Sequence, residues 1–173
     1  MPHQIRIRMA ETQDVAVMHA LLQPFAKQHI LLPRSEDDLF QHLQEFVVAE
    51  YDGEVSGAAS IHVYGSNLAE IRSLAVDSAH QGAGIGHLLV EACEKLAAGL
   101  GVTCMFALTY VPEFFGKMGY DIVPKESLPH KIWTVCVHCA KFSDCDEVAV
   151  KKQFSDAPFE TMKVIPILEV DQA

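Results

Sequence analysis

The sequence predicts an α/β (α+β) domain in which helices flank a central sheet. Apolar or alternating runs of strand length recur along the chain, and longer runs with helical spacing lie between them. One strand and one helix are joined directly by a glycine-rich turn at residues 81–86. Because this strand, turn and helix fill residues 68–92 without interruption, we place them at the centre of the fold.

Length and composition limit the class of protein. The chain has 173 residues, half of them hydrophobic, which is typical of one globular domain. A formal net charge of −10 argues against general binding to nucleic acid or to an anionic membrane. No apolar run is long enough to span a bilayer, and the N-terminus lacks the pattern of a signal peptide. We therefore expect a cytoplasmic protein without nucleic-acid or membrane partners.

The first elements are one strand and two helices. Residues 4–9 alternate apolar and polar side chains, which predicts a strand, and Thr12 is expected to cap the first helix. The apolar face of that helix comprises Val15, Met18, Leu21, Leu22 and Phe25. After a loop at residues 27–34, Ser35 and Asp38 form a capping-box pattern for the second helix. The residues expected to point inward from it are Leu39, Phe40 and Leu43.

Three strands lead to the glycine-rich turn. They are expected at residues 46–51, 55–64 and 68–76. Asp52-Gly53 is a strong hairpin signal between the first two, and we interpret Gly57 as a bulge position. The helix after the turn is expected to end near Gly99. Its apolar face comprises Ile85, Leu88, Leu89, Ala92 and Leu96.

The remaining elements complete one domain at residues 1–154. Strands are expected at residues 102–108, 120–123 and 147–154. A short helix is expected to begin at Pro112 and to stop at Gly119. Residues 125–146 form an insertion, and residues 155–173 form a C-terminal tail that we expect to supply an edge strand or a partner contact. We therefore regard a homodimer as compatible with the sequence.

The glycine-rich turn indicates an anion site. Glycines between a strand and a helix let the backbone approach a ligand closely, and the first amides of the helix then favour negative charge. The alternative interpretation of these glycines is a tight structural turn that binds no anion. A P-loop is excluded because Gly86-His87 stands where Gly-Lys-Ser/Thr is required. The dinucleotide fingerprint also lacks its context here.

The residues around this turn resemble a known motif. Leu74-Ala75-Val76-Asp77, followed by Gln81-x-x-Gly84-x-Gly86, is similar to motif A of the GNAT acyltransferases. The resemblance implies the GNAT fold, a mixed central sheet of about seven strands that is splayed between strands 4 and 5 and flanked by about four helices. It also implies acetyl-CoA as co-substrate, with the pantetheine arm between residues 68–76 and 102–108.

Longer stretches resemble a narrower family. Residues 69–76, 106–115 and 128–133 look like the short stand-alone N-acetylglutamate synthases, which are amino-acid N-acetyltransferases. This resemblance implies direct acetyl transfer in a ternary complex to the α-amino group of an amino acid, L-glutamate, in arginine biosynthesis. Two alternatives stay open. One is acetylation of another small amine or of a protein N-terminus, and the other is a catalytically weak regulatory module that binds acetyl-CoA.

The resemblance places the acetyl-CoA site on the central strand and the turn. The residues expected to bind the cofactor are Leu74, Ala75, Val76, Gln81, Gly82, Ala83, Gly84, Ile85, Gly86 and Phe115. The backbone N–H of Val76 would polarise the thioester carbonyl. The turn contains no Lys or Arg, so cofactor binding must depend on its amides. His80 and His87 could help to bind the cofactor, and the alternative is that both are plain surface residues.

Two side chains are candidates for proton transfer. Glu70 matches a general base of the superfamily, and strand alternation places it on one face with Arg72, Leu74 and Val76 unless a bulge intervenes. The alternative is that Glu70 only pairs with Arg72. Phe115 stands where many members carry a tyrosine acid, so Tyr110 is the nearest substitute, unless water or the low basicity of the leaving thiolate suffices. The alternative for Tyr110 is that it is a core residue.

Cations and cysteines complete the candidate residues. An acidic acceptor needs positive partners, and Arg72, Arg34 and Lys27 are the candidates. Cys136-x2-Cys139-x5-Cys145 could hold zinc, but we favour reduced thiols and expect no metal. Cys93 and Cys104 are expected to be small core residues.

Overall fold

One mixed sheet carries the architecture of this computed structural model, which describes residues 2–128, 145–154 and 168–171. Its strands are β1 (Gln4–Met9), β2 (Phe46–Tyr51), β3 (Glu54–Gly65), β4 (Leu68–Val76), β5 (Cys104–Thr109), β6 (Asp121–Val123), β7 (Val148–Gln153) and β8 (Leu168–Asp171). The α-helices are α1 (Val15–Lys27), α2 (Glu36–Gln41), α3 (Ile85–Gly99) and α4 (Pro112–Gly116). The strand order is β6-β7-β5-β4-β3-β2-β1-β8, and only β4 and β5 pair in parallel. The predicted fold class and order of elements are confirmed.

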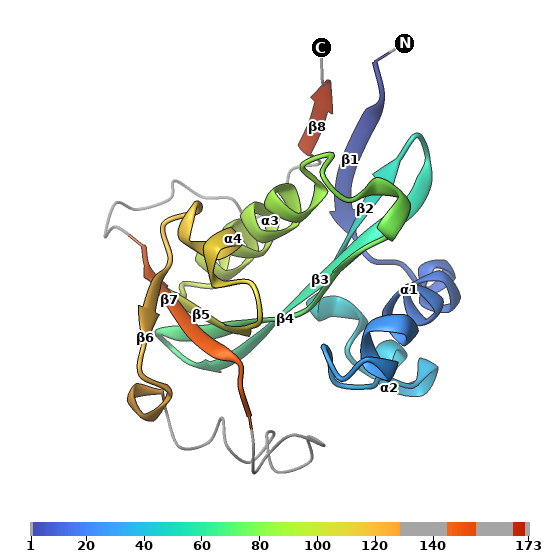
Figure 1. Cartoon of the computed structure of the whole chain (residues 1–173). Coiled ribbons are helices and arrows are strands. Elements are labelled where there is room, and N and C mark those ends of the chain that lie inside the picture. Colours follow the sequence, from blue (N-terminus) through green and yellow to red (C-terminus); the bar gives the residue numbers. More distant parts are fainter. Residues whose placement is uncertain (1, 129–144, 155–167, 172–173) are drawn as a thin grey trace.

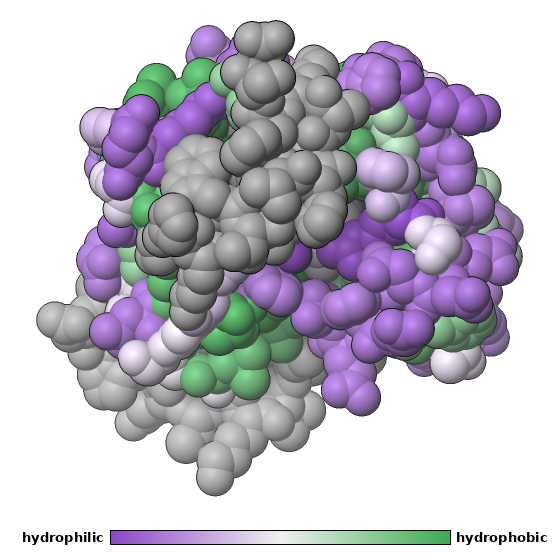
Figure 2. Space-filling model, turned by 90° about the horizontal axis from the view of Figure 1, so that it is seen from below, coloured by the Kyte–Doolittle hydropathy of each residue, from purple (hydrophilic) through white to green (hydrophobic). Residues whose placement is uncertain are grey.

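Helices cover both faces of the sheet (Figure 1). On one face, Ile85 and Leu89 of α3 and Phe115 of α4 pack on the central strands. On the other face, Met18 of α1 and Leu39 of α2 pack on β2, β3 and β4. The outer side of α1 and α2 is mostly hydrophilic (Figure 2). Among the described helices, none combines the length and the apolarity that crossing a bilayer requires.

The start of α1 differs from its sequence-based prediction. Thr12 is not the cap, because a 3-10 turn at Thr12–Asp14 precedes the helix. The Asp14 carboxylate accepts the Glu11 amide at 2.7 Å and two bonds from Arg8 at 2.7 and 2.9 Å. The Arg8 hydrogen bonds outweigh burial and lower the pKa of Asp14. This bidentate pair ties β1 to the start of α1.

The prediction that Phe40 points inward was wrong, because its side chain is 49% exposed. Ser35 does cap α2 by accepting the Asp38 amide at 3.1 Å, and Leu39 is fully buried. The helix has only six residues. Adjacent positions lie about 100° apart around a helix, so one that buries Leu39 turns Phe40 outward.

The β2–β3 hairpin forms as its turn residues predict. Asp52 and Gly53 both have positive φ angles, 51° and 89°, which is typical of a two-residue type I′ turn. The register then shifts by one residue, because Ala49 pairs with Gly57 whereas Glu50 pairs with Val55. A bulge therefore lies beside Gly57, where the sequence indicated one.

The parallel pair β4–β5 is short. Leu68, Ala69 and Glu70 pair with residues 104–106, and no pairing continues beyond Glu70. The two strands then separate, which is the splay that the family resemblance implied. Within the described ranges, the second half of β4 is therefore paired on its β3 side alone.

Gly57→Ala tests the packing of α3 on the sheet. A Cβ at Gly57 would lie 2.9 Å from Cγ2 of Ile85 and 2.9 Å from Cδ1 of Leu89. Because both neighbours belong to the packed core, we expect the free energy of unfolding in urea to fall by about 1–3 kcal/mol. Gly116→Ala is the matched control, since a Cβ there meets no atom within 4 Å. Equal stability of the two variants would contradict this packing.

Candidate active site

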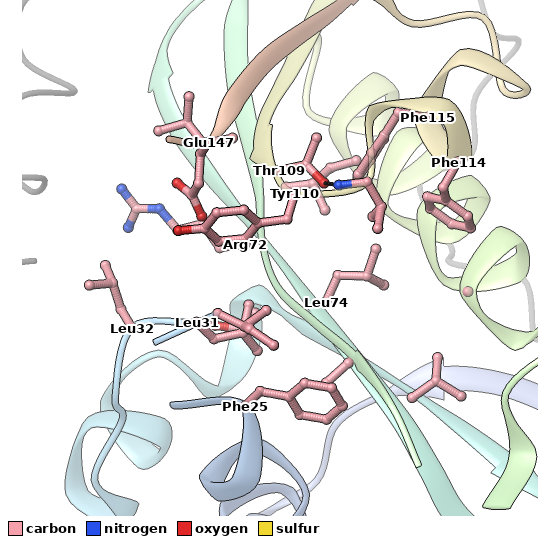
Figure 3. Close-up of a pocket in the computed structure, with 18 of the residues that line it drawn as sticks. Phe25, Leu31, Leu32, Arg72, Leu74, Thr109, Tyr110, Phe114, Phe115 and Glu147 are labelled. Carbon is pink, nitrogen blue, oxygen red and sulfur yellow. Dashed lines mark hydrogen bonds between the residues drawn. The ribbon is translucent and has the colours of Figure 1, made fainter. Parts of the chain in front are cut away.

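A cavity of about 990 Å³ opens where β4 and β5 separate (Figure 3). Its walls are the second half of β4, the end of β5, the segment between α1 and α2, the turn before α3, and α4. This volume is at the upper end of the range for small-molecule sites. The strand separation, the glycine-rich turn and two of the candidate acceptor cations, Arg34 and Arg72, therefore meet in one space.

A bulge in β4 divides this site between two faces of the sheet. Ala75 pairs with Ala58 but Arg72 pairs with Ser60, so β4 contains one extra residue. Ser73 has a φ of 52°, in the left-handed region. A bulge exchanges the two faces of a strand. The prediction that Glu70, Arg72, Leu74 and Val76 share a face was therefore wrong, as its stated exception allowed.

The side chains of the two halves of β4 consequently face opposite sides of the sheet. Leu74 and Val76 pack against the core under α3. Ala75 belongs to the core under α1 and α2, and Arg72, which pairs with Ser60, lies on that same face. The side chains that hold charge thus lie on the α1–α2 side, and the backbone next to the glycine-rich turn lies on the α3 side.

The amide of Val76 is directed into the gap between β4 and β5. The Asp77 amide donates to the Ser56 carbonyl at 2.8 Å, so this residue pair is hydrogen-bonded. The N–H groups of successive strand residues point in opposite directions. Val76 therefore turns its N–H away from β3, which is the orientation that an oxyanion donor needs.

The glycine-rich turn presents unbonded amides. Gly84 has a φ of 86° and caps α3, and Gly82 has a φ of 85°. In the described part of the chain, the amides of Gly84, Ile85 and Gly86 donate to no acceptor. At the start of a helix such amides form an anion site.

Other residues of the turn have structural roles. Gln81 lines the cavity, and its Nε2 donates to the Val76 carbonyl at 3.3 Å. Ala83, which we expected to bind the cofactor, does not line the cavity, and its amide donates to the His80 carbonyl at 3.4 Å. A Cβ at Gly86 would lie 3.2 Å from the Phe114 ring, so a glycine lets α4 approach α3.

Two histidines flank the turn and line the cavity. The His80 ring lies 4.4 Å from the ring of Tyr51, and the His87 ring meets the edge of Phe114 at 4.8 Å between centroids. Both imidazoles are therefore fixed by aromatic contacts beside the anion site. They are the basic side chains closest in sequence to a turn that contains no Lys or Arg.

Glu70 and Arg72 form an ion pair inside the cavity. Nε of Arg72 donates to Oε2 of Glu70 at 2.7 Å, and the Tyr64 hydroxyl donates to the same oxygen at 3.0 Å. No described residue donates to the other oxygen, Oε1. Burial opposes the charge of Arg72, but the Glu70 carboxylate outweighs it and raises the pKa of the guanidinium. The ion pair that we weighed for Glu70 is therefore present, and one carboxylate oxygen has no donor among the described residues.

The other candidate cations lie differently. Arg34 lines the cavity, donates to Oδ2 of Asp38 at 2.8 Å, and lies over the Phe46 ring at 5.3 Å. Lys27, in contrast, is exposed in the last turn of α1 and does not line the cavity. The structure therefore brings Arg34 and Arg72 to the site and leaves Lys27 outside it.

Tyr110 and Phe115 line the β5–α4 side of the cavity. Tyr110 directly follows β5, and Figure 3 shows it at the same end of the cavity as Arg72 and Glu147. Phe115 is 3% exposed and packs edge-on against Phe114 and Tyr120. Phe115 therefore supplies an apolar wall, whereas Tyr110 offers the hydroxyl.

Sequence reasoning missed two residues of the site, Tyr64 and Glu147. The hairpin between β3 and β4 places Tyr64 next to Glu70, so the predicted turn at residues 65–67 could have indicated it. Glu147 precedes β7, and nothing in its sequence context marks it.

The cysteines divide into three groups. Cys93 and Cys104 are buried, as expected, and burial raises the pKa of each thiol. Cys145 lines the cavity and its Sγ lies 4.0 Å from Oε2 of Glu147. Cys136 and Cys139 lie outside the described residues, and the described residues contain no cluster of metal-binding side chains.

The site and fold have counterparts of known family. Residues 14–120 match the model of the acetyltransferase (GNAT) family. An uncharacterised N-acetyltransferase from Chlorobaculum tepidum is 40% identical over 146 residues, 84% of this chain and 94% of the relative. The amino-acid acetyltransferase of Mycobacterium tuberculosis is 39% identical over 117 residues, 66% of this chain and 67% of that protein.

Two solved structures that contain coenzyme A are similar to this chain. A Mycobacterium tuberculosis protein in complex with CoA and NLQ matches with a TM-score of 0.75 and 30% identity, over 86% of this chain and 99% of that one. N-acetylglutamate synthase from Neisseria gonorrhoeae, complexed with coenzyme A and N-acetyl-glutamate, matches with a TM-score of 0.79 and 27% identity. The match covers 87% of this chain and 35% of the synthase chain.

Proposed function

Because the chain belongs to the acetyltransferase (GNAT) family, we propose that it transfers the acetyl group of acetyl-CoA to the α-amino group of an amino acid, with L-glutamate as the acceptor. One observation carries this proposal. Where β4 separates from β5, the Val76 amide and the first amides of α3 at Gly84, Ile85 and Gly86 have no acceptor among the described residues on one side of a cavity, and Arg72 lies on the other side. The first side suits a thioester with a diphosphate, and the second suits an acidic acceptor.

Acetyl-CoA is held mainly by backbone. The diphosphate lies at the amides of Gly84, Ile85 and Gly86, where the helix dipole favours negative charge. The pantetheine arm pairs with the free edge of β4 at Leu74 and Val76, as an added strand would. Leu74, Phe114 and Phe115 give this part of the cavity an apolar lining.

The transfer step uses groups on both sides of the bulge. Glu70 takes a proton from the acceptor ammonium through Oε1, directly or through water. The amine nitrogen then forms a bond to the thioester carbon, and the Val76 amide stabilises the oxyanion. As the carbon–sulfur bond breaks, Tyr110 donates a proton to the leaving thiolate, and the second proton that the nitrogen loses on becoming an amide restores the tyrosine hydroxyl.

The acceptor carboxylates require cations, and two arginines provide them. Arg72 is the first choice because its guanidinium lines the cavity beside Glu70, and Arg34 enters from the α1–α2 segment. The names of the relatives support an amino-acid acceptor, since several are called amino-acid acetyltransferases. A panel of amino acids, small amines and N-terminal peptides, assayed by release of free CoA thiol, tests the choice of acceptor.

Arg72→Ala should raise the KM for glutamate by about tenfold or more while leaving the KM for acetyl-CoA nearly unchanged, because it removes a charged hydrogen bond to the acceptor alone. Steady-state kinetics with each substrate varied in turn measures both constants. Arg6→Ala is the matched control, because Arg6 pairs with a carboxylate on β2 and does not line the cavity. An equal loss of affinity for both substrates would instead assign Arg72 to folding.

Glu70→Gln should reduce kcat by roughly 10²–10⁴-fold, since the amide keeps the shape of the side chain but cannot accept the proton. Single-turnover measurements at saturating acetyl-CoA isolate this step. The control is Glu94→Gln, which alters another ion-paired carboxylate, that of the Glu94–Lys152 pair. Retention of turnover in Glu70→Gln would leave Glu70 with only its ion-pair role.

A further inference from the structure

Tyr64 reaches the candidate site from β3, although the proposed reaction gives it no task. It is the next-to-last residue of the strand, and its side chain is almost fully buried. Its ring lies 5.8 Å from the Phe106 ring and meets the His62 ring edge-on at 4.9 Å. These contacts fix the ring, so the hydroxyl has a defined position.

The hydroxyl closes a ring of hydrogen bonds with Glu70 and Arg72. It donates to Oε2 of Glu70 at 3.0 Å and accepts from Nη2 of Arg72. Nε of Arg72 donates to that same carboxylate oxygen at 2.7 Å. Burial, together with the Glu70 charge, raises the pKa of Tyr64, so the hydroxyl keeps the proton that it donates.

This ring determines which edge of the guanidinium remains available. A guanidinium has five N–H donors in a plane. The edge formed by Nε and Nη2 is used by Glu70 and Tyr64, whereas no described residue accepts from Nη1. The remaining edge of the guanidinium is the end of the fork, formed by Nη1 and the second N–H of Nη2. This edge can bind a carboxylate in a bidentate manner.

The backbone of Arg72 is fixed as well. Oγ of Ser60, directly opposite on β3, donates to the Arg72 carbonyl at 3.2 Å. The residue is thus held at its carbonyl, at Nε and at Nη2. A side chain that is already ordered loses little entropy when a ligand binds, so its contribution to affinity is greater.

We propose that Tyr64 is a positioning residue that determines acceptor specificity by holding Arg72 with the end of its fork toward the acceptor carboxylate. The inference rests on the proposed function, because it takes Arg72 as the acceptor's partner. It adds a second requirement, that the arginine be oriented and not merely present. A lysine at this position would keep the charge but could not bind Glu70, Tyr64 and a carboxylate in one plane.

Tyr64→Phe is the decisive variant, because it removes the hydroxyl and keeps the ring that packs on Phe106. We expect the KM for the amino acid to rise about tenfold, with kcat changed by less than about threefold and the KM for acetyl-CoA unchanged. Arg72→Lys should raise the same constant. Tyr120→Phe is the matched control, since Tyr120 is also a buried tyrosine but does not line the cavity.

A double-mutant cycle separates positioning from general stability. In an Arg72→Ala background, Tyr64→Phe should have no further effect on the acceptor KM, because the group that it positions is gone. Tyr64→Phe should likewise have no effect on the KM for an acceptor whose carboxylates are replaced by amides. Thermal melting of each variant accompanies the kinetics, and a lowered melting temperature with an unchanged acceptor KM would assign Tyr64 to structure alone.

The results distinguish a failure of this inference from a failure of the proposed function. An unchanged KM in Tyr64→Phe, or the same rise with and without Arg72, overturns the inference and leaves the proposed function intact. Absence of amino-acid turnover by the unaltered chain overturns the proposed function, and this inference with it.

Discussion

The structure depends on one constraint in the middle of the sheet: β4 pairs with β3 on both sides of its bulge, but in the described chain it pairs with β5 over only three residues. Buried backbone N–H and C=O groups in proteins nearly always have hydrogen-bond partners. The free edge of β4 therefore needs either another strand or a ligand that can pair with it. The splay creates the cavity and leaves it lined by backbone donors, so the proposed cofactor site arises from the sheet topology itself.

The bulge at Ser73 places the charged and the apolar side chains of β4 on opposite sides of the sheet. A serine in the left-handed region carries a modest strain, of roughly 1–2 kcal/mol. In return, the strand presents Glu70 and Arg72 to the α1–α2 side and Leu74 and Val76 to the α3 side. A regular strand would have placed all four side chains on one face. The charged pair would then lie against the apolar core under α3, where unsatisfied charge is costly.

Local patterns in the sequence were enough to locate the centre of the fold. The residues of β4 follow from an apolar run between two turns, and the position of α3 follows from Gly84 and the helical spacing after it. The family motif then implied the splay. Three features could not be read in this way. The position of the bulge depends on the register between β3 and β4. The exposure of Phe40 depends on how short α2 is, and the position of Lys27 depends on where α1 ends.

The site illustrates the same limit. The sequence motif was enough to place Val76, Gly84 and Gly86 along the cavity, because a backbone that leaves room for a ligand requires a particular local sequence. Tyr64 was not, because its role comes from a hydrogen bond across a hairpin to Glu70 and Arg72. Ala83 was included only because it lies within the motif, and its amide bonds to the His80 carbonyl instead.

Amide hydrogen exchange with and without acetyl-CoA tests the central claim most directly. The account predicts that the amides of Val76, Gly84, Ile85 and Gly86 exchange readily in the free protein and become protected when the cofactor binds, while the Ala83 amide changes little. Saturating acetyl-CoA that leaves the exchange of Val76 and Gly84–Gly86 unchanged would contradict it.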